Sequence, residues 1–197
     1  MLPTAATLAA AVIGATANPV VAAPDGQVRV SVYDLHAAAA SVHLTGGIAS
    51  GGKWFGWVPL RNAGGGSWST VLRAPGYLGV YPVVVRAGGA TQPTDEVVSV
   101  LPRGWAKQPG FDAPEQVAQW WTRQAPAGAT LESVTTWPSG FFTHRDRSLN
   151  RLLRVRFALL GEWRGKHLRQ GPHELFFSVA RLRPDGQWRL LETITAP

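Results

Sequence analysis

Apolar and polar residues alternate over short stretches in the first half of the chain. Val28, Val30 and Val32 alternate with polar side chains, which is the pattern of a strand with one buried face. Glycine-rich turns separate this stretch from later apolar ones, which lie at residues 42–44, 54–58, 68–72, 80–85 and 97–100. Short strands at such regular spacing predict an all-β sandwich, and we place it at residues 24–101.

The pattern changes at residues 101–114, where proline and glycine are frequent and the alternation stops. This composition predicts a linker, which we place at residues 102–111. Asp112 and Pro114 then predict the start of a helix, because aspartate caps helix N-termini and proline suits the first turn. The buried face of this helix is expected to begin at Val117.

Alternation returns after the helix and continues to the end of the chain. The expected strands are residues 130–137, 149–160, 173–183 and 187–195. The sequence Pro184-Asp185-Gly186 predicts the hairpin turn between the last two. Residues 112–197 are therefore predicted to form a second, α+β domain, with one helix packed on an antiparallel sheet.

The sandwich region resembles a known class of domain. Residues 68–86 (WSTVLRAPGYLGVYPVVVR) resemble the last hairpin of bacterial immunoglobulin-like or fibronectin-III-like domains, in which a Gly-x-Tyr opens a strand. The resemblance implies that Tyr81 donates a hydrogen bond back to the backbone at a corner. Pro82 departs from the pattern and predicts a bulge or an edge, because proline cannot donate to the ladder. Such domains serve as spacers or binding modules.

The second domain also resembles a known class. Residues 115–121 and 175–194 resemble the C-terminal part of an NTF2-like (cystatin-like α+β) domain, in which a sheet curls around a helix to form a cone. Enzymatic members place acid–base groups inside the cone. Glu192 is the candidate carboxylate there, since it has the same strand parity as Trp188. Such domains usually begin with more helix than the single one expected here.

The first 23 residues contain no charged side chain. An apolar stretch is followed by small residues at cleavage spacing, which predicts a secretory signal with the mature N-terminus between Asn18 and Asp25. The alternatives are a disordered, alanine-rich tail and a misassigned start. Arginine greatly outnumbers lysine, which is typical of a GC-rich bacterial source. We therefore expect an exported bacterial protein, located outside the cell or at its envelope.

The chain of 197 residues has a formal net charge of +7 and no cysteine. The absence of cysteine excludes disulfides, thiolate metal sites and a cysteine nucleophile. Apolar residues make up 45%, which excludes a disordered polycation. The histidines lack the spacing of a metal site, and no motif indicates catalytic residues or a cofactor.

Basic side chains crowd residues 145–169, where the only acidic ones are Asp146 and Glu162. Guanidinium groups suit phosphate and carboxylate, so this stretch predicts a docking surface for an anionic partner. The alternative is a solvated strand face in an arginine-rich chain. The candidate residues are Arg151, Arg154, Arg156 and Arg164. No nucleic-acid motif accompanies them, so we expect an anionic envelope component or a protein partner.

Trp54 and Trp57 lie in the sequence KWFGW between glycine-rich turns. Their positions have opposite parity on a strand, so one of them is expected on a binding surface. The alternative is that both pack in the core between the sheets.

These observations predict an exported, non-catalytic interaction module that binds a partner or polyanion through a basic face of its second domain. One alternative is a small-ligand binder or enzyme that uses the cone. Another is an accessory component of a conjugation or secretion system, where NTF2-like domains also occur. A pocket within residues 112–197 would favour the small-ligand alternative.

Overall fold

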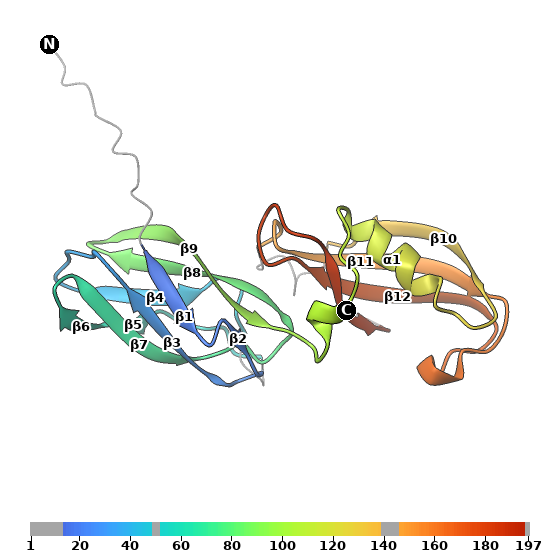
Figure 1. The fold of residues 1–197 in the computed structure, drawn as a ribbon, viewed down its shortest axis with the longest axis horizontal. Coiled ribbons are helices and arrows are strands. Elements are labelled where there is room, and N and C mark those ends of the chain that lie inside the picture. Colours follow the sequence, from blue (N-terminus) through green and yellow to red (C-terminus); the bar gives the residue numbers. More distant parts are fainter. Residues whose placement is uncertain (1–13, 49–51, 139–145, 196–197) are drawn as a thin grey trace, which may run out of the picture.

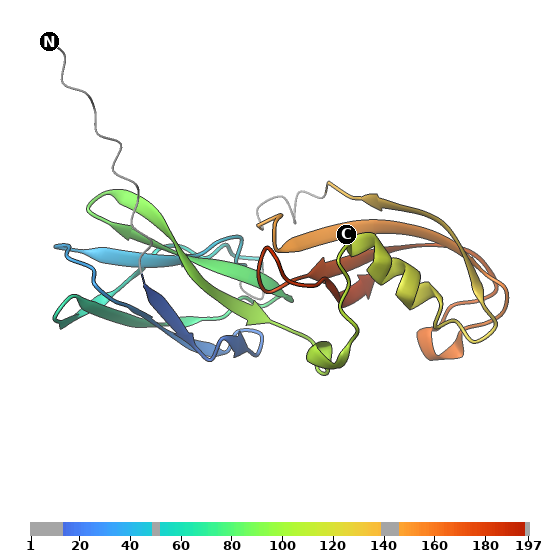
Figure 2. The same ribbon diagram turned by 45° about the horizontal axis from the view of Figure 1, so that its top comes forward.

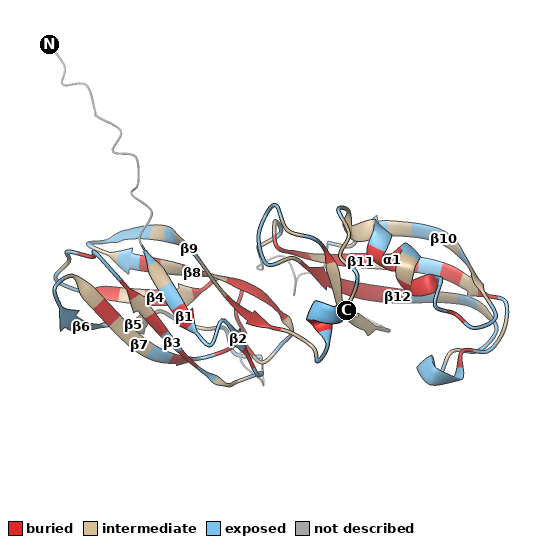
Figure 3. Cartoon of the chain, in the orientation of Figure 1, coloured by how far each residue is buried: buried red, intermediate tan, exposed pale blue. Residues whose placement is uncertain are grey.

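The computed structural model describes residues 14–48, 52–138 and 146–195. The chain is mostly β-sheet with one short α-helix, and its two parts lie end to end along the long axis (Figure 1). Two sheets form the N-terminal part, and a third sheet with the helix forms the C-terminal part. Buried residues run along the central strands of both parts (Figure 3).

Nine strands form the two N-terminal sheets. The first sheet has the order β1-β3-β7-β6, made of Ala15–Asn18, Gln27–Val32, Ser67–Arg73 and Arg61–Gly64. The second has the order β2-β9-β8-β4-β5, made of Val21–Ala22, Ala90–Val100, Gly79–Ala87, Ala40–Leu44 and Val58–Pro59. One apolar cluster fills the space between them. Val28, Val30 and Val32 of β3 belong to it and are fully buried, as their alternation predicts.

The β8 strand confirms two sequence predictions. The Tyr81 hydroxyl donates to the Tyr77 carbonyl oxygen at 2.7 Å. The register between β8 and β9 shifts between Pro82 and Val84, so the bulge lies directly at the proline. Both features come from local side-chain chemistry, which is why the sequence predicts them.

Residues 15–22, which the sequence places within the expected signal or tail, form two strands. β1 pairs along its length with β3, and β2 pairs in parallel with β9. Ala17 and Ala22 lie in the core between the sheets. Ala17 and Ala22, two of the small residues near the expected cleavage site, are therefore inward positions of strands, whereas Val21 and Ala23 are exposed. A cut between Asn18 and Asp25 would remove β1.

The segment between residues 54 and 58 also differs from its prediction as a strand. Only the two-residue β5 and an isolated bridge between Ile48 and Trp54 form there. Gly56, between the aromatic residues, contributes no side chain to a ladder and lowers strand propensity.

The C-terminal sheet is an antiparallel meander in the order β10-β11-β12-β13. Its strands are Ala129–Thr136, Asn150–Leu159, Gly171–Ala180 and Arg189–Ile194. The helix α1, Pro114–Thr122, lies across one face, and the sheet curves around it (Figure 2). A short 3₁₀ turn, η2, at Arg164–Lys166 interrupts the connection from β11 to β12.

The start of α1 lies one residue beyond the expected cap. Pro114 is the first helical residue, as predicted, but the N-cap is Ala113 and not Asp112. The Ala113 amide donates to Oε1 of Gln116 at 3.3 Å, so the first turn is closed by glutamine. The signal for this was the glutamine three positions after Ala113.

The expected linker is packed and ordered. Its 3₁₀ turn η1, Trp105–Lys107, buries Trp105 in a cluster that includes Val80 from the N-terminal part and Leu191 from the C-terminal part. Further along, Phe111 forms reciprocal main-chain hydrogen bonds with Trp188. The segment therefore joins the two parts through contacts as well as through the chain.

Asn150, at the start of β11, makes the most specific contact between the two parts. Its Oδ1 accepts from the Val80 amide at 3.0 Å, and its Nδ2 donates to the Val80 carbonyl oxygen at 2.7 Å. Asn150 is only 4% exposed. Its side-chain amide thus takes the place of a neighbouring strand beside β8.

Candidate anion-binding surface on the C-terminal sheet

The face of the C-terminal sheet that points away from α1 carries two of the predicted arginines. In the ladder between β11 and β12, Arg154 lies opposite Phe176 and Arg156 lies opposite Glu174. Directly opposed residues share a face of the sheet. We call this the outer face, because Leu153 and Val155, on the other face, pack in the cluster under α1.

Glu174 holds both guanidinium groups through a single oxygen. Its Oε2 accepts from Nη2 of Arg154 and from Nε of Arg156, each at 2.7 Å. The side chains of Arg154, Arg156 and Glu174 are 29%, 49% and 35% exposed. The three groups therefore form a solvent-facing cluster with one net positive charge.

The carboxylate of this cluster is stabilised in its charged form. The hydrogen bonds from Arg154 and then Arg156 hold the pKa of Glu174 below its ordinary value. At neutral pH the carboxylate thus orients both guanidinium groups. Because each guanidinium has five N–H donors, the bond to Glu174 leaves donor capacity on both.

Trp137 supports Arg154 from the adjacent strand end. The Arg154 guanidinium carbon lies 5.0 Å from the Trp137 ring centroid, within the range of a cation–π contact. Trp137 in turn packs edge-on against Phe176, with 5.4 Å between their centroids. The Nε of Arg154 is buried without a hydrogen-bond partner, so stacking and the Glu174 bond hold this side chain.

A shallow hollow of about 350 Å³ adjoins Arg156. Its lining residues are Glu132, Arg156, Pro172, His173 and Glu174. Its two carboxylates disfavour an anion inside it. A bound anion would therefore contact the guanidinium groups on the exposed surface of the face.

The other two predicted arginines lie elsewhere. Arg151 has the parity of the helix-covered face, and its guanidinium lies 5.8 Å from the Trp188 ring centroid. Arg164 lies beyond the end of β11, is 87% exposed, and is 3.2 Å from a carboxylate oxygen of Glu162. The structure therefore brings together only Arg154 and Arg156, and the expectation of a single four-arginine surface is wrong. The reason is that Arg154 lies three positions after Arg151, an odd offset that reverses the face.

Glu192 does not lie in the cone. It pairs with Ser178, on the outer face, whereas Leu190 pairs with Val179 and packs on the helix side. A bulge between these two pairs inserts an extra residue into β13 and reverses the parity. Counting alternate residues from Trp188 therefore placed Glu192 on the helix-covered face, whereas it lies on the outer face.

Aromatic side chains fill the space between α1 and the sheet. The Trp121 ring centroid lies 4.6 Å from that of Trp163, 5.0 Å from that of Phe177 and 5.7 Å from that of Phe157. In a cone enzyme, this space would hold the substrate. Side chains therefore fill the space between α1 and the sheet. A shallow hollow of about 290 Å³ lies beside the helix instead, lined by Phe111, Gln116, Gln119, Trp120, Arg123 and Gln124.

The two tryptophans of the KWFGW segment are both outside the inter-sheet core. Trp54 is 50% exposed. Trp57 packs on the outer side of the second N-terminal sheet, with the Arg86 guanidinium 4.0 Å from its ring centroid and the His43 ring at 5.3 Å. The core-packing alternative is therefore wrong for both.

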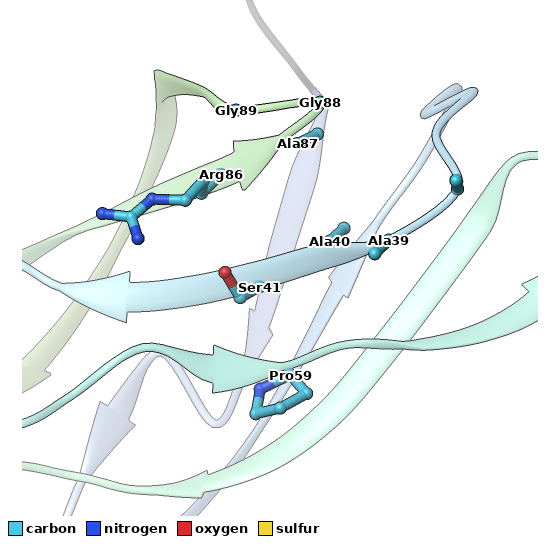
Figure 4. Close-up of a pocket in the computed structure, with 9 residues that line it drawn as sticks. Ala39, Ala40, Ser41, Pro59, Arg86, Ala87, Gly88 and Gly89 are labelled. Atoms are coloured by element: carbon cyan, nitrogen blue, oxygen red, sulfur yellow. The ribbon is translucent and has the colours of Figure 1, made fainter.

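A second hollow, of about 470 Å³, lies near Arg86 between β4, β5 and β8 (Figure 4). Alanine and glycine form most of its lining, and the Arg86 side chain extends away from Gly88 and Gly89. With a single charged group at its rim, this hollow offers little to orient a ligand.

Within the ranges that the structure describes, no three acidic or histidine side chains gather to hold a metal ion. No helix among those same residues has the length and apolar character needed to cross a bilayer. No protein-family model matches the chain, and no curated protein does. The function must therefore be inferred from the geometry of the site.

Proposed function

We propose that this protein is a non-catalytic interaction module that binds an anionic partner through the outer face of its C-terminal sheet. The observation that carries the proposal is the Arg154–Glu174–Arg156 cluster stacked on Trp137. Glu174 and Trp137 fix the guanidinium groups before a partner arrives, which lowers the entropy cost of binding. Sulfate, phosphate and carboxylate groups match the guanidinium fork.

The architecture that we propose is an immunoglobulin-like sandwich followed by an NTF2-like domain. Two packed sheets and the Tyr81 corner bond support the first. The helix on a curved antiparallel meander supports the second. Immunoglobulin-like domains commonly act as spacers or binding modules, in line with the proposed role. Location at the cell envelope remains a prediction, which the N-terminal sequence of protein from its native host would test.

The test uses dextran sulfate as a soluble polyanion. Wild type should bind it with an affinity that falls steeply with salt, and R154Q/R156Q should weaken binding by roughly tenfold at low salt. The matched control is R61Q/R73Q, which removes the same charge from exposed positions of the N-terminal part. Equal weakening by the two variants would show that only net charge matters and would overturn the proposal.

A further inference from the structure

A second basic surface lies at the end of the molecule that is remote from the N-terminal part (Figures 1 and 2). We call it the distal tip: residues 123–128, which follow α1, and residues 160–170, which connect β11 to β12. The Leu160 amide donates to the Gly128 carbonyl oxygen at 3.1 Å and joins the two segments. The tip is therefore a single surface built from two parts of the chain.

The distal tip combines cations with an exposed apolar side chain. Leu160 is 62% exposed, more than any other large apolar side chain that the structure describes. Only one acidic residue, Glu162, occurs in the two segments, and it lies next to Arg164. The same two segments carry four exposed cations, Arg123, Arg164, Lys166 and Arg169.

The loop that carries these cations is anchored from beneath. Trp163 is buried against Trp121, and it exchanges main-chain hydrogen bonds with Leu168 at 2.8 and 3.2 Å. His167 turns the chain between them in the left-handed region, with φ of 57°. A buried tryptophan therefore anchors a loop whose outward-facing side chains, apart from Leu160, are all polar or charged.

We infer that the distal tip docks on an anionic lipid bilayer, independently of the outer face. An exposed leucine on a surface rich in exposed cations fits an interface where the apolar side chain enters the acyl boundary and the cations remain among the headgroups. A free phosphate would contact the cations but not Leu160. An acidic protein surface would match the charges but would leave Leu160 without a role.

The experiment measures binding of the intact chain to vesicles of phosphatidylcholine with 30% phosphatidylglycerol, and to pure phosphatidylcholine vesicles, by flotation. Binding should require the anionic lipid. K166Q/R169Q should weaken it by at least about tenfold, since each cation near such a surface contributes about fivefold. L160S should weaken vesicle binding by roughly tenfold but leave dextran sulfate binding unchanged.

Comparison with the outer-face variant separates this inference from the proposed function. R154Q/R156Q should bind anionic vesicles like wild type, while K166Q/R169Q should retain most dextran sulfate binding. The inference is overturned if wild type does not bind anionic vesicles, if tip variants bind them like wild type, or if L160S has no effect. The last result would indicate attraction by charge alone, as to an acidic protein.

Discussion

At the residue scale, Asn150 carries the contact between the two parts of the chain. One buried side-chain amide satisfies both the amide and the carbonyl of Val80, where the β4 strand no longer covers β8. A buried backbone group without a partner costs about 1–3 kcal/mol. Asn150 therefore ties the stability of the N-terminal part to that of the C-terminal part.

We predict that N150A lowers the free energy of unfolding by about 2–4 kcal/mol, because it leaves both Val80 groups buried and unpaired. N150D should cost less than N150A, since the carboxylate can still accept from the Val80 amide. Urea unfolding measures both. The control is N62A, in the exposed edge strand β6, where Oδ1 of Asn62 accepts from the Gly64 amide, and its cost should be about 0.5 kcal/mol. A cost for N150A no larger than that of N62A would contradict the assignment.

The partly buried carboxyl of Glu96 should make the free energy of unfolding depend on pH. Burial raises the pKa of its carboxyl, and a hydrogen bond from the Ala17 amide opposes this only in part. A raised pKa means that this group favours folding fully below its ordinary value of 4.5 and loses that contribution as pH rises through the folded pKa. Ionised Glu96 thus lowers the stability of the folded chain, because burial of the charge costs more than the bond from Ala17 returns.

E96Q should therefore melt at a higher temperature than wild type at pH 7, because glutamine can accept the same hydrogen bond without a charge. The two melting temperatures should converge as pH falls below 4.5, where Glu96 is protonated. Thermal melting between pH 3.5 and 7 tests this. A difference of opposite sign, or one that does not change with pH, would be inconsistent with a raised pKa.

The alternation of apolar and polar residues predicted most of the strands, but it predicted only in part which face of the sheet each side chain occupies. Val28, Val30 and Val32 are all inward, because β3 is regular. Glu192 and Arg151 were misplaced for different reasons: the bulge reverses parity before Glu192, whereas Arg151 was grouped by proximity along the chain. A bulge depends on contacts between strands, which a single stretch of sequence does not contain.

At the element scale, truncation before and after β1 tests whether this strand stabilises the N-terminal part. A chain that begins at Gly14 keeps β1 and should melt like the full chain. A chain that begins at Asp25 loses β1 and β2, exposes the edge of β3, and should melt at least about 5 °C lower. Differential scanning calorimetry of the two chains gives the comparison. Equal melting temperatures would show that β1 adds nothing to the sandwich.

The composition of the expected linker predicted its lack of regular structure but not its tertiary contacts. Proline and glycine correctly indicated that residues 102–111 contain no long helix or strand. They did not indicate that Trp105 would be buried between the two parts, or that Gln108 would accept hydrogen bonds from Arg189 and Leu190. Those contacts depend on residues about 80 positions away, so no local pattern contains them.

At the scale of the whole molecule, these contacts predict that the two parts move as one unit. Proteases should cut wild type only slowly within residues 102–111. W105A removes a large buried side chain from the junction and should accelerate cutting there by at least about tenfold. Limited trypsin digestion, with its target sites at Arg103 and Lys107, measures the rate. Rapid cutting of wild type at these sites would mean that the junction is open.

The outer face and the distal tip both belong to the C-terminal part, so their relative position depends on that part alone. The sequence predicted the arginines of the outer face and the solvent-facing side of their strand. It did not predict that Glu174, 18 residues from Arg156, would hold both of them. The register between β11 and β12 places Glu174 beside both arginines, and it therefore sets the positions of the guanidinium groups that would bind an anion.

The most direct test of the central claim follows the Nε–Hε resonances of the arginines by NMR during titration with dextran sulfate. The resonances of Arg154 and Arg156 should shift at the lowest polyanion concentrations, before those of Arg29, Arg61 and Arg73 in the N-terminal part. E174Q should broaden or move the two resonances even without polyanion, because it removes the carboxylate that orients them. Shifts of equal size at all arginines, or shifts that leave Arg154 and Arg156 unchanged, would contradict binding through the outer face.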